Sequence, residues 1–366
     1  MNIVIAGGGT GGHLFPGVAI AQEFLRRDPA ANILFIGTDA GLESRVLPGL
    51  GLALATVPVS GFTGKAMVQK MKSLLTVPRA LLSAAKCLRR HKADLVLGLG
   101  GYISFPGIAA AKALGIPAVI HEQNSVPGLS NRMLGAIADR IFISYEESRP
   151  FFNAPKTVFS GMPVRMSQHA AAPEADDGRL CVFICGGSQG AHAINEAMMK
   201  ALPDLENVKR SIRFIHQTGA KDTAMVAQEY EKRGFVASVF AFINDMYGCY
   251  AQAHVVVSRA GASTLAELAL CGKPSILIPY PHAAHNHQEH NARTFVGKGA
   301  ALLLLAPELN GRLLGQTILG LNADRKKLVV MAAQANMLAQ PDAAGRVVEE
   351  CCRLAATKGG AHGRHH

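Results

Sequence analysis

Short apolar runs alternate with longer stretches of helical spacing along the chain. In the first half, each apolar run is followed by a glycine or polar turn and then by an amphipathic stretch. This pattern predicts helices at residues 17–27 and 125–137 and strands at residues 3–6, 33–36, 95–97, 118–120, 140–144 and 157–160. Apolar strands that alternate with helices are typical of a parallel sheet covered on both faces.

The same alternation restarts after Pro163. It predicts helices at residues 191–200, 222–232, 263–271 and 342–354 and strands at residues 181–185, 213–217, 236–240, 255–258 and 275–278. We therefore expect an α/β chain with two doubly wound, Rossmann-like domains at residues 1–163 and 164–341, and a disordered tail at residues 357–366. A length of 366 residues agrees with this number of domains, at roughly 150 residues each.

Composition narrows the class of protein. Hydrophobic residues make up 49% and charged residues 17% of the chain, which excludes disorder for most of it. Seven cysteines without a C-x-x-C pair indicate reduced thiols in a cytosolic protein. We expect no signal peptide at the start and no membrane span, because glycines and prolines interrupt the apolar segment 95–120.

The net charge of +11 favours an anionic partner. Between Ser44 and Ala93, nine Lys and Arg residues meet no Asp or Glu, and apolar residues interleave with them. This basic amphipathic stretch suits an anionic membrane surface, although a solvated helix face over a core stripe would show the same pattern. We expect no nucleic-acid partner, because no nucleic-acid motif accompanies the charge. The candidate membrane residues are Lys65, Lys70, Lys72, Leu74, Leu75, Arg79 and Leu82.

Two glycine-rich turns follow predicted strands and open predicted helices. They read Gly7-Gly8-Gly9-Thr10-Gly11-Gly12-His13 and Gly186-Gly187-Ser188-Gln189-Gly190-Ala191-His192. Such turns bring backbone N–H groups and the positive end of a helix toward an anion, so each half is predicted to hold a phosphate-type site. A tight packing turn is the alternative. The first turn also matches the dinucleotide fingerprint, but its acidic partner is poorly placed, with Asp39 the nearest.

Candidate catalytic groups lie after three strands of the first domain. His13 begins the helix behind the first glycine turn, where the helix end keeps imidazole neutral and able to accept a proton as a general base. A capping or packing histidine is the alternative. Residues 98–102 and 121–124 follow two further strands and would reach the same sheet edge. Glu122 in the latter segment is a second candidate base.

A third strand, turn and helix run from Ser258 to Glu267. Small residues at 260–263 allow close backbone approach, and the Glu267 carboxylate is spaced to accept both hydroxyls of a ribose. An ordinary first-turn glutamate favoured by the helix dipole is the alternative. Further along, His282, His285 and His290 belong to a histidine-rich segment whose spacing matches no zinc motif. We therefore favour a polar ligand loop over a metal site there.

In this order, the motifs resemble glycosyltransferase family 28, and within it the bacterial N-acetylglucosaminyltransferases of peptidoglycan synthesis. The resemblance spans residues 1 to about 350. It implies a GT-B fold, with two Rossmann-like domains facing a cleft and the last helix, about residues 342–354, returning to the first domain. The family often has Asn where this chain has Met162, and Asp where it has His285. The residues that carry the resemblance are the two glycine turns, residues 98–102, 121–124, 163–165, 242–246 and 261–267, and Gln288 before Asn291-Ala292.

The resemblance implies an inverting transfer of N-acetylglucosamine from UDP-GlcNAc to the 4-hydroxyl of lipid I. Lipid I is N-acetylmuramoyl-pentapeptide on undecaprenyl diphosphate, and the product would be lipid II. No cofactor and no metal are implied, because Arg165 and the second glycine turn would stabilise the charge on the departing UDP. The resemblance also implies a peripheral protein on the cytoplasmic side of the cell membrane, with partners in cell-wall synthesis and division complexes.

By motif match, the resemblance also assigns roles to single residues. His13 would be the base, with Glu122 as the second candidate, and Ile243 would meet the uracil through its backbone. The acceptor diphosphate would lie at Gly9, Gly100, Gly101 and Tyr102. The donor would be held by Thr10, Gly11, Gly12, Asn124, Arg165, Ser188, Ile243, Ala262, Ser263, Thr264, Leu265, Ala266, Glu267 and Gln288.

Three other functions stay open at this point. An NAD-dependent enzyme would explain the first glycine turn, but neither the second one nor Arg165. A non-catalytic sensor of sugar nucleotides would keep the donor motifs and would not need His13. Another GT-B enzyme, such as a diacylglycerol glucosyltransferase, would share the fold, but residues 98–102 and 121–124 favour the lipid I enzyme over it.

Overall fold

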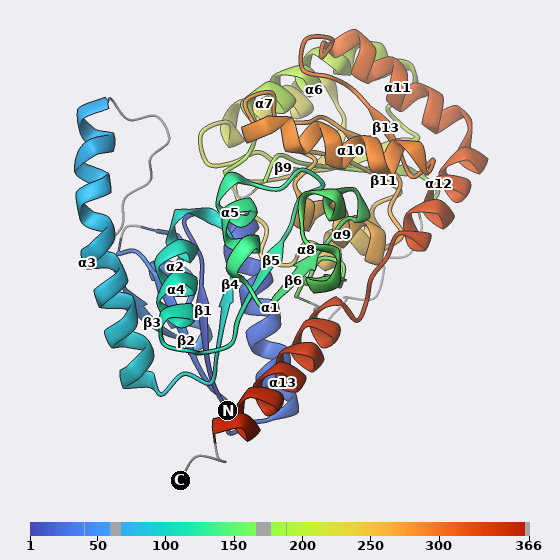
Figure 1. Cartoon of the computed structure of the whole chain (residues 1–366). Coiled ribbons are helices and arrows are strands. Elements are labelled where there is room, and N and C mark those ends of the chain that lie inside the picture. Colours follow the sequence, from blue (N-terminus) through green and yellow to red (C-terminus); the bar gives the residue numbers. More distant parts are fainter. Residues whose placement is uncertain (40, 59–66, 166–176, 188, 363–366) are drawn as a thin grey trace. The chain divides into compact units, whose positions relative to one another are not determined.

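The computed structural model describes residues 1–39, 41–58, 67–165, 177–187 and 189–362; of residues 67–77 and 358–362 it describes the backbone alone. The chain forms two compact units, Met1–Arg165 together with Asp342–His366, and Met166–Pro341. Each unit has one parallel sheet with helices packed against it (Figure 1). This confirms the prediction of a GT-B-type α/β chain with two Rossmann-like, doubly wound units.

The first sheet has seven parallel strands in the order β3-β2-β1-β4-β5-β6-β7. These strands are β1 (Asn2–Ala6), β2 (Asn32–Gly37), β3 (Ala53–Thr56), β4 (Leu95–Gly98), β5 (Ala118–Glu122), β6 (Arg140–Ile143) and β7 (Thr157–Phe159). The helices of this unit are α1 (Gly11–Arg27), α2 (Glu43–Val46), α3 (Met67–His91), α4 (Gly101–Ala113), α5 (Leu129–Ile137) and α13 (Ala343–His362), with short 3-10 turns η1 (Pro48–Leu50), η2 (Glu146–Phe151) and η3 (Ala154–Lys156).

The second sheet has six parallel strands in the order β10-β9-β8-β11-β12-β13. These strands are β8 (Leu180–Cys185), β9 (Ile212–Gln217), β10 (Val236–Phe240), β11 (Val255–Ser258), β12 (Ser275–Leu277) and β13 (Ala301–Leu303). The helices are α6 (His192–Leu205), α7 (Thr223–Arg233), α8 (Met246–Gln252), α9 (Ala262–Leu270), α10 (His287–Gly297), α11 (Gly311–Ala323) and α12 (Arg325–Met337), with 3-10 turns η4 (Glu206–Val208) and η5 (Ala284–Asn286).

Alternate side chains of the central strands pack into two different core layers, one on each face of the sheet. In β1, Ile3 and Ile5 pack into the layer that contains α1, whereas Val4 and Ala6 pack into the layer that contains α3 and α4. All four are fully buried. This two-sided burial explains why the strands read as continuous apolar runs in the sequence. In each sheet the strand order reverses beside one strand, between β1 and β4 and between β8 and β11, and doubly wound folds bind ligands at such switch points.

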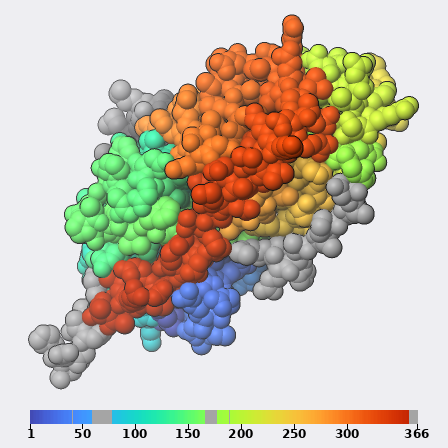
Figure 2. Space-filling model, turned by 90° about the vertical axis from the view of Figure 1, so that its right-hand side faces the viewer, coloured from blue at the N-terminus to red at the C-terminus, as the bar shows by residue number. Residues whose placement is uncertain are grey.

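The last helix, α13, packs on the first unit beside α1 (Figures 1 and 2). Val347 and Val348 are buried in the same core layer as Ile3. At the polar edge, Arg140 Nε donates to Glu350 at 2.9 Å and Arg346 Nε donates to the Ser160 carbonyl at 3.0 Å. The chain end therefore completes the core that its first strand begins.

Several helix boundaries differ from the prediction; α6, for example, continues to Leu205 rather than ending at residue 200. The first helix begins at Gly11 rather than at residue 17, so the glycine turn leads directly into it. The helix predicted from residue 125 begins at Leu129, because Gly128 is its N-cap residue in extended conformation and Pro127 disfavours a helical conformation at Val126. The last helix continues to His362, so residues 357–362, expected in a disordered tail, are helical. Extending an existing helix costs little, since only its nucleation is unfavourable.

Candidate functional site

The first glycine turn joins β1 to α1 at the switch point of the first sheet. Gly9 has a φ of +81°, and its N–H donates to Oε2 of Glu43 at 2.7 Å. Thr10 is the N-cap residue of α1. The first N–H groups of a helix have no partner within it, so those of Gly11 and Gly12 are available to an anion. A Cβ placed on Gly12 would meet no atom within 4 Å, which shows that the space beside it is open.

His13 lies where two turns meet. It belongs to the first turn of α1, and its Nδ1 is 3.3 Å from Oγ1 of Thr10. The facing turn, between β4 and α4, has positive φ at Gly100 (+89°) and Gly101 (+71°). A Cβ on Gly100 would lie 3.1 Å from Nδ2 of Asn131 and 3.4 Å from Nε2 of His13, so the imidazole lies within contact distance of this turn. Tyr102 follows and is 37% exposed.

Glu122 ends β5 and is only 2% exposed. Its carboxylate accepts hydrogen bonds from the Asn124 N–H at 2.9 Å, from Nδ2 of Asn131 at 2.9 Å and from the Gly128 N–H at 3.3 Å. Burial raises the pKa of Glu122, and the hydrogen bonds from Asn124 and Asn131 partly oppose that shift. Hydrogen bonds from the following loop and from α5 thus engage both oxygens of this carboxylate and hold Asn124 in place.

Two further bonds tie this loop to the β4–α4 turn. Gln123 Nε2 donates to the Leu99 carbonyl at 2.9 Å, and Ser130 Oγ donates to the Gly101 carbonyl at 2.7 Å. Beside them, burial lowers the pKa of His121 to about 4, so this histidine is neutral near pH 7. The structure therefore brings the three predicted segments of the first unit together at one sheet edge.

In the second unit, Gln217 connects two of the predicted segments. At the end of β9, its Nε2 donates to the Gly187 carbonyl at 2.9 Å, and its Oε1 accepts from the Ile243 N–H at 2.8 Å. The backbone N–H of Ile243 is thereby engaged inside the protein. Ser188, predicted to bind the donor, lies outside the described residues. Gln217 was not predicted, since in the sequence it is merely a polar residue that ends a buried strand.

The second glycine turn approaches the following loop closely. Gly190 has a φ of +74°, and a Cβ there would lie 1.8 Å from the Thr218 carbonyl oxygen. Gly219, with a φ of +79°, would place a Cβ 2.1 Å from the Gln189 carbonyl oxygen. Only glycine at both positions lets these two backbones pass each other. The turn leads into α6, whose first N–H groups face the same edge of the sheet.

The β11–α9 turn carries the third predicted segment. Ala262, Ser263, Thr264, Leu265 and Ala266 form the first part of α9, and Gly261 is its N-cap residue. The buried Ser263 hydroxyl has no hydrogen-bond partner among the described atoms.

Glu267 follows these residues on α9. Its Oε2 accepts the Tyr250 hydroxyl at 2.9 Å. Burial raises the pKa of Glu267 to about 6, although the bond from Tyr250 lowers it. No other hydrogen bond from the described residues engages this carboxylate, which leaves an oxygen for a hydroxyl of a ligand. At neutral pH the ionised form predominates.

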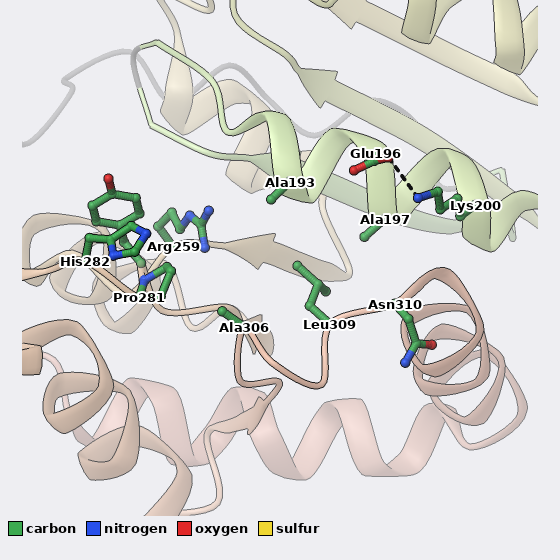
Figure 3. A pocket seen from close by; sticks show the side chains of 11 residues that line it. Ala193, Glu196, Ala197, Lys200, Arg259, Pro281, His282, Ala306, Leu309 and Asn310 are labelled. Atoms are coloured by element: carbon green, nitrogen blue, oxygen red, sulfur yellow. Dashed lines mark hydrogen bonds and ion pairs between the residues drawn. The ribbon is translucent and has the colours of Figure 1, made fainter.

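The histidine-rich segment runs from the loop after β12 into α10. Among the described residues, no three His, Cys, Asp or Glu side chains gather closely enough to hold a metal ion. Gln288 accepts the Tyr280 N–H at 2.9 Å, and His285 adopts a left-handed φ of +52°. His282 instead lines a pocket of about 360 Å³ next to Arg259, opposite the Glu196–Lys200 pair of α6 (Figure 3). The Arg259 guanidinium donates to the Ile278 and Pro279 carbonyls, so it braces the loop that begins this segment.

The remaining predicted residues lie near the end of the first unit or in and before α3. Arg165 is exposed near the end of the first unit, and Met162, which stands where the family often has Asn, is buried with its Sδ 3.5 Å from the Ser144 hydroxyl. Lys65 lies outside the described residues, as do the side chains of Lys70, Lys72, Leu74 and Leu75. No helix within the described ranges combines the length and the apolar run that crossing a membrane requires.

Comparison with known proteins places this site in a family. The N-terminal domain of glycosyltransferase family 28 matches residues 3–143, and its C-terminal domain matches residues 181–347. Together these ranges cover most of both units. The chain belongs to glycosyltransferase family 28. The matched ranges include the three predicted segments of the first unit. In the second unit they include the glycine turn, Ile243, Glu267 and Gln288.

Relatives within family 28 match almost the whole chain. A protein of Geobacter metallireducens is 46% identical over 355 residues, which are 96% of this chain and 98% of that protein. A protein of Myxococcus xanthus is 44% identical over 367 residues, which cover 100% of this chain and 96% of that protein. Both are named UDP-N-acetylglucosamine–N-acetylmuramyl-(pentapeptide) pyrophosphoryl-undecaprenol N-acetylglucosamine transferase.

Solved structures agree with the family 28 fold. The crystal structure of Acinetobacter baumannii MurG has a TM-score of 0.79 at 30% identity and covers 96% of this chain and 99% of that one. The calicheamicin glycosyltransferase CalG4 has a TM-score of 0.70, and the match covers 97% of this chain and 98% of that one. Its 15% identity supports a shared fold alone.

Proposed function

We propose that this chain transfers N-acetylglucosamine from UDP-GlcNAc to lipid I and so forms lipid II. The observation that carries the proposal is that relatives 44–46% identical over nearly the whole chain are named for this reaction. The site supports it independently, because each unit presents a glycine turn and a helix N-terminus at its switch point. An enzyme that transfers a sugar from a nucleotide diphosphate to an acceptor carried on a lipid diphosphate binds two diphosphates, so it needs two such anion sites.

The donor nucleotide lies on the second unit in this proposal. Glu267 accepts the ribose hydroxyls through the carboxylate that Tyr250 orients at 2.9 Å. The N-terminus of α9 and the turn before α6 face the diphosphate with backbone N–H groups. Because the Ile243 N–H is bonded to Gln217, its carbonyl is the group left to meet the uracil. Arg165 and Gln288 complete the donor contacts, at the phosphate and the sugar respectively.

The acceptor lies on the first unit. His13 takes the proton from the 4-hydroxyl, and attack on the face of the sugar opposite UDP inverts the anomeric centre. Thr10, Gly11, Gly12 and Asn124 approach the donor sugar, and the turn at Gly100–Tyr102 receives the acceptor diphosphate. Negative charge that develops on UDP is stabilised by helix N-termini and by the Arg165 cation.

Release of UDP from UDP-GlcNAc tests the proposal directly. With a short-chain lipid I analogue, we expect UDP release that depends on the acceptor and persists in EDTA, because protein cations and helix N-termini supply the charge stabilisation. Replacing UDP-GlcNAc with UDP-glucose should abolish most of it. Release without acceptor, or none despite tight binding of UDP-GlcNAc, would contradict the assignment of lipid I.

Donor binding is expected to weaken in acid through Glu267. Burial raises its pKa to about 6 in the free protein, and the ionised form is the one that accepts two ribose hydroxyls. The dissociation constant of UDP should therefore rise below pH 6, by up to tenfold per pH unit, and be flat above pH 7. Calorimetry from pH 5 to 8 measures this. Glu267→Gln should bind weakly at every pH; a variant with the same pH dependence as the native chain would exclude Glu267 as its source.

We also propose that α3 attaches the protein to an anionic membrane surface. On its described half, Ala80, Ala84 and Leu88 face the core, whereas the outer face exposes Arg79, Lys86 and Arg89 around Leu82, which is 72% exposed. An apolar residue among cations suits lipid headgroups, and each cation near the surface contributes about 1 kcal/mol.

Vesicle sedimentation tests this attachment. Arg79→Glu with Lys86→Glu is expected to reduce binding to vesicles of anionic lipid by at least tenfold. The control, Lys326→Glu with Lys327→Glu on α12, changes the net charge equally on an exposed face of the second unit. Equal losses in both double variants would show that total charge, not α3, governs the attachment.

A further inference from the structure

Glu43 is a buried carboxylate beneath the first glycine turn. It is the first residue of the four-residue helix α2 and is fully buried. Its Oε2 accepts the Gly9 N–H at 2.7 Å, and its Oε1 accepts the Thr38 N–H at 2.8 Å and the Thr38 hydroxyl at 3.0 Å. One side chain therefore joins the turn after β1 to the turn after β2.

Three glycines make room for this carboxylate. A Cβ on Gly8 would lie 2.5 Å from the carboxyl group of Glu43, and one on Gly41 would lie 2.2 Å from it. A Cβ on Gly37 would lie 2.5 Å from its Cγ. Side chains are thus excluded on three sides, and the remaining contacts are hydrogen bonds. The surrounding backbone is therefore shaped to hold this carboxylate.

The buried group is charged. Burial by itself raises the pKa of Glu43, but hydrogen bonds from the backbone N–H groups of Gly9, Glu43 and Thr38 and from the Thr38 hydroxyl outweigh it, so the pKa lies below its usual value. Hydrogen bonds to a carboxylate are about twice as strong as those between neutral groups. An ionised Glu43 therefore holds Gly9 more firmly than a neutral side chain would.

Holding Gly9 has a consequence for the catalytic groups. The positive φ of Gly9 sets the direction in which the chain enters α1, and His13 lies four residues further on. The bond to Glu43 also uses the Gly9 N–H, so the amides of Gly11 and Gly12 are the ones left for an anion. A negative charge directly behind Gly9 repels phosphate from that end of the turn, so the acceptor diphosphate expected at Gly9 is assigned instead to Gly100–Tyr102 alone.

We propose that Glu43 is a positioning residue for the transfer reaction, which fixes the first glycine turn so that His13 meets the acceptor hydroxyl and the Gly11 and Gly12 amides meet the donor sugar. This inference rests on the proposed function. It predicts that the loss of the carboxylate impairs use of the acceptor even when the protein is fully folded. A purely structural role would lower stability and leave the kinetics of the folded molecules unchanged.

The test compares Glu43→Gln with Val348→Ala. The first keeps the size of the side chain and replaces one oxygen by an amide that opposes an N–H donor. The second truncates a buried residue of the same core layer, on α13. Both are assayed at a temperature at which circular dichroism shows them folded. Thr38→Val, which removes only the hydroxyl donor, provides a milder variant that folds if Glu43→Gln does not.

For Glu43→Gln we expect kcat/KM for the lipid I analogue to fall at least tenfold, with the dissociation constant of UDP within twofold of the native value. Thr38→Val should show a smaller fall in the same direction, and Val348→Ala none. In amide NMR spectra, the Gly9 proton should shift upfield in Glu43→Gln, because it loses its bond to a charged acceptor.

Two results would overturn the inference. One is native kcat/KM in folded Glu43→Gln, or in folded Thr38→Val if Glu43→Gln does not fold. The other is an equal loss in Val348→Ala and in the Glu43→Gln variant. Absence of transfer by the native chain would instead refute the proposed function, so the two failures are distinguishable.

Discussion

Replacing His13 with alanine is expected to lower kcat for transfer by about 10²–10⁴, the usual contribution of a general base. The imidazole lies at the meeting point of two glycine turns, where the acceptor hydroxyl has to lose its proton. The partly exposed side chain contributes little to the core, so the folding of the variant should be unchanged. Affinity for UDP should also be unchanged, because the proposed UDP contacts come from the second unit and from Arg165 and do not include His13. Steady-state kinetics with a lipid I analogue and calorimetry with UDP measure the two quantities.

His91→Ala is the matched control for this prediction. His91 ends α3, and its Nε2 is 3.2 Å from the Asn32 carbonyl, at the opposite end of the strands. The control should keep native activity. If His13→Ala also keeps it while Glu122→Gln loses it, the base is Glu122, and the hydrogen bonds around that carboxylate would have to rearrange when substrate binds.

Gly190→Ala is expected to destabilise the second unit by about 3–5 kcal/mol. Two effects add: a φ of +74° is unfavourable for alanine by about 1–2 kcal/mol, and the new Cβ would lie 1.8 Å from the Thr218 carbonyl oxygen. Since that neighbour is backbone, the loop between β9 and α7 has to move away, which adds the cost of overpacking. Urea denaturation followed by circular dichroism reports the free energy of unfolding.

Gly234→Ala separates the two effects. Gly234 ends α7 with a φ of +70°, and the nearest atom to its Cβ would be the flexible end of Lys209, at 3.7 Å. This control carries the backbone strain without the clash, so we expect a loss of about 1–2 kcal/mol. Equal destabilisation by both substitutions would show that the two loops separate easily and that the close approach has little energetic importance.

The central strands and the glycine turns could be predicted because their signals are local. A strand buried on both faces, such as β1 or β8, is a continuous apolar run in any context. The edge strands β3 and β13 were missed. Ala53–Thr56 contains two alanines, which have little strand propensity, and Ala301–Leu303 spans only three residues. Their pairing with one neighbour each is decided by the sheet, not by their own composition.

The clustering of site residues could be predicted only in part. The ends of parallel strands meet at one edge, which correctly brought His13 and Gly100 together. Glu43 and Gln217 escaped prediction because their roles arise from contacts with Gly9 and Gly187, which are 34 and 30 positions away. Nothing in the sequence around Glu43 indicates that it is buried. Hydrophobic periodicity also does not indicate from which backbone N–H groups a carboxylate accepts hydrogen bonds.

The position of α13 has a consequence for protein synthesis. Val347, Val348 and Cys351 belong to the core that contains Ile3 and Ile5, so the first unit lacks part of its interior until the last helix has left the ribosome. The whole of Met166–Pro341 is translated in between. At about 5–20 residues per second this takes roughly 10–35 s. During that interval the second unit can fold on the ribosome. In the first unit, the apolar residues that α13 later covers stay exposed and can be bound by chaperones.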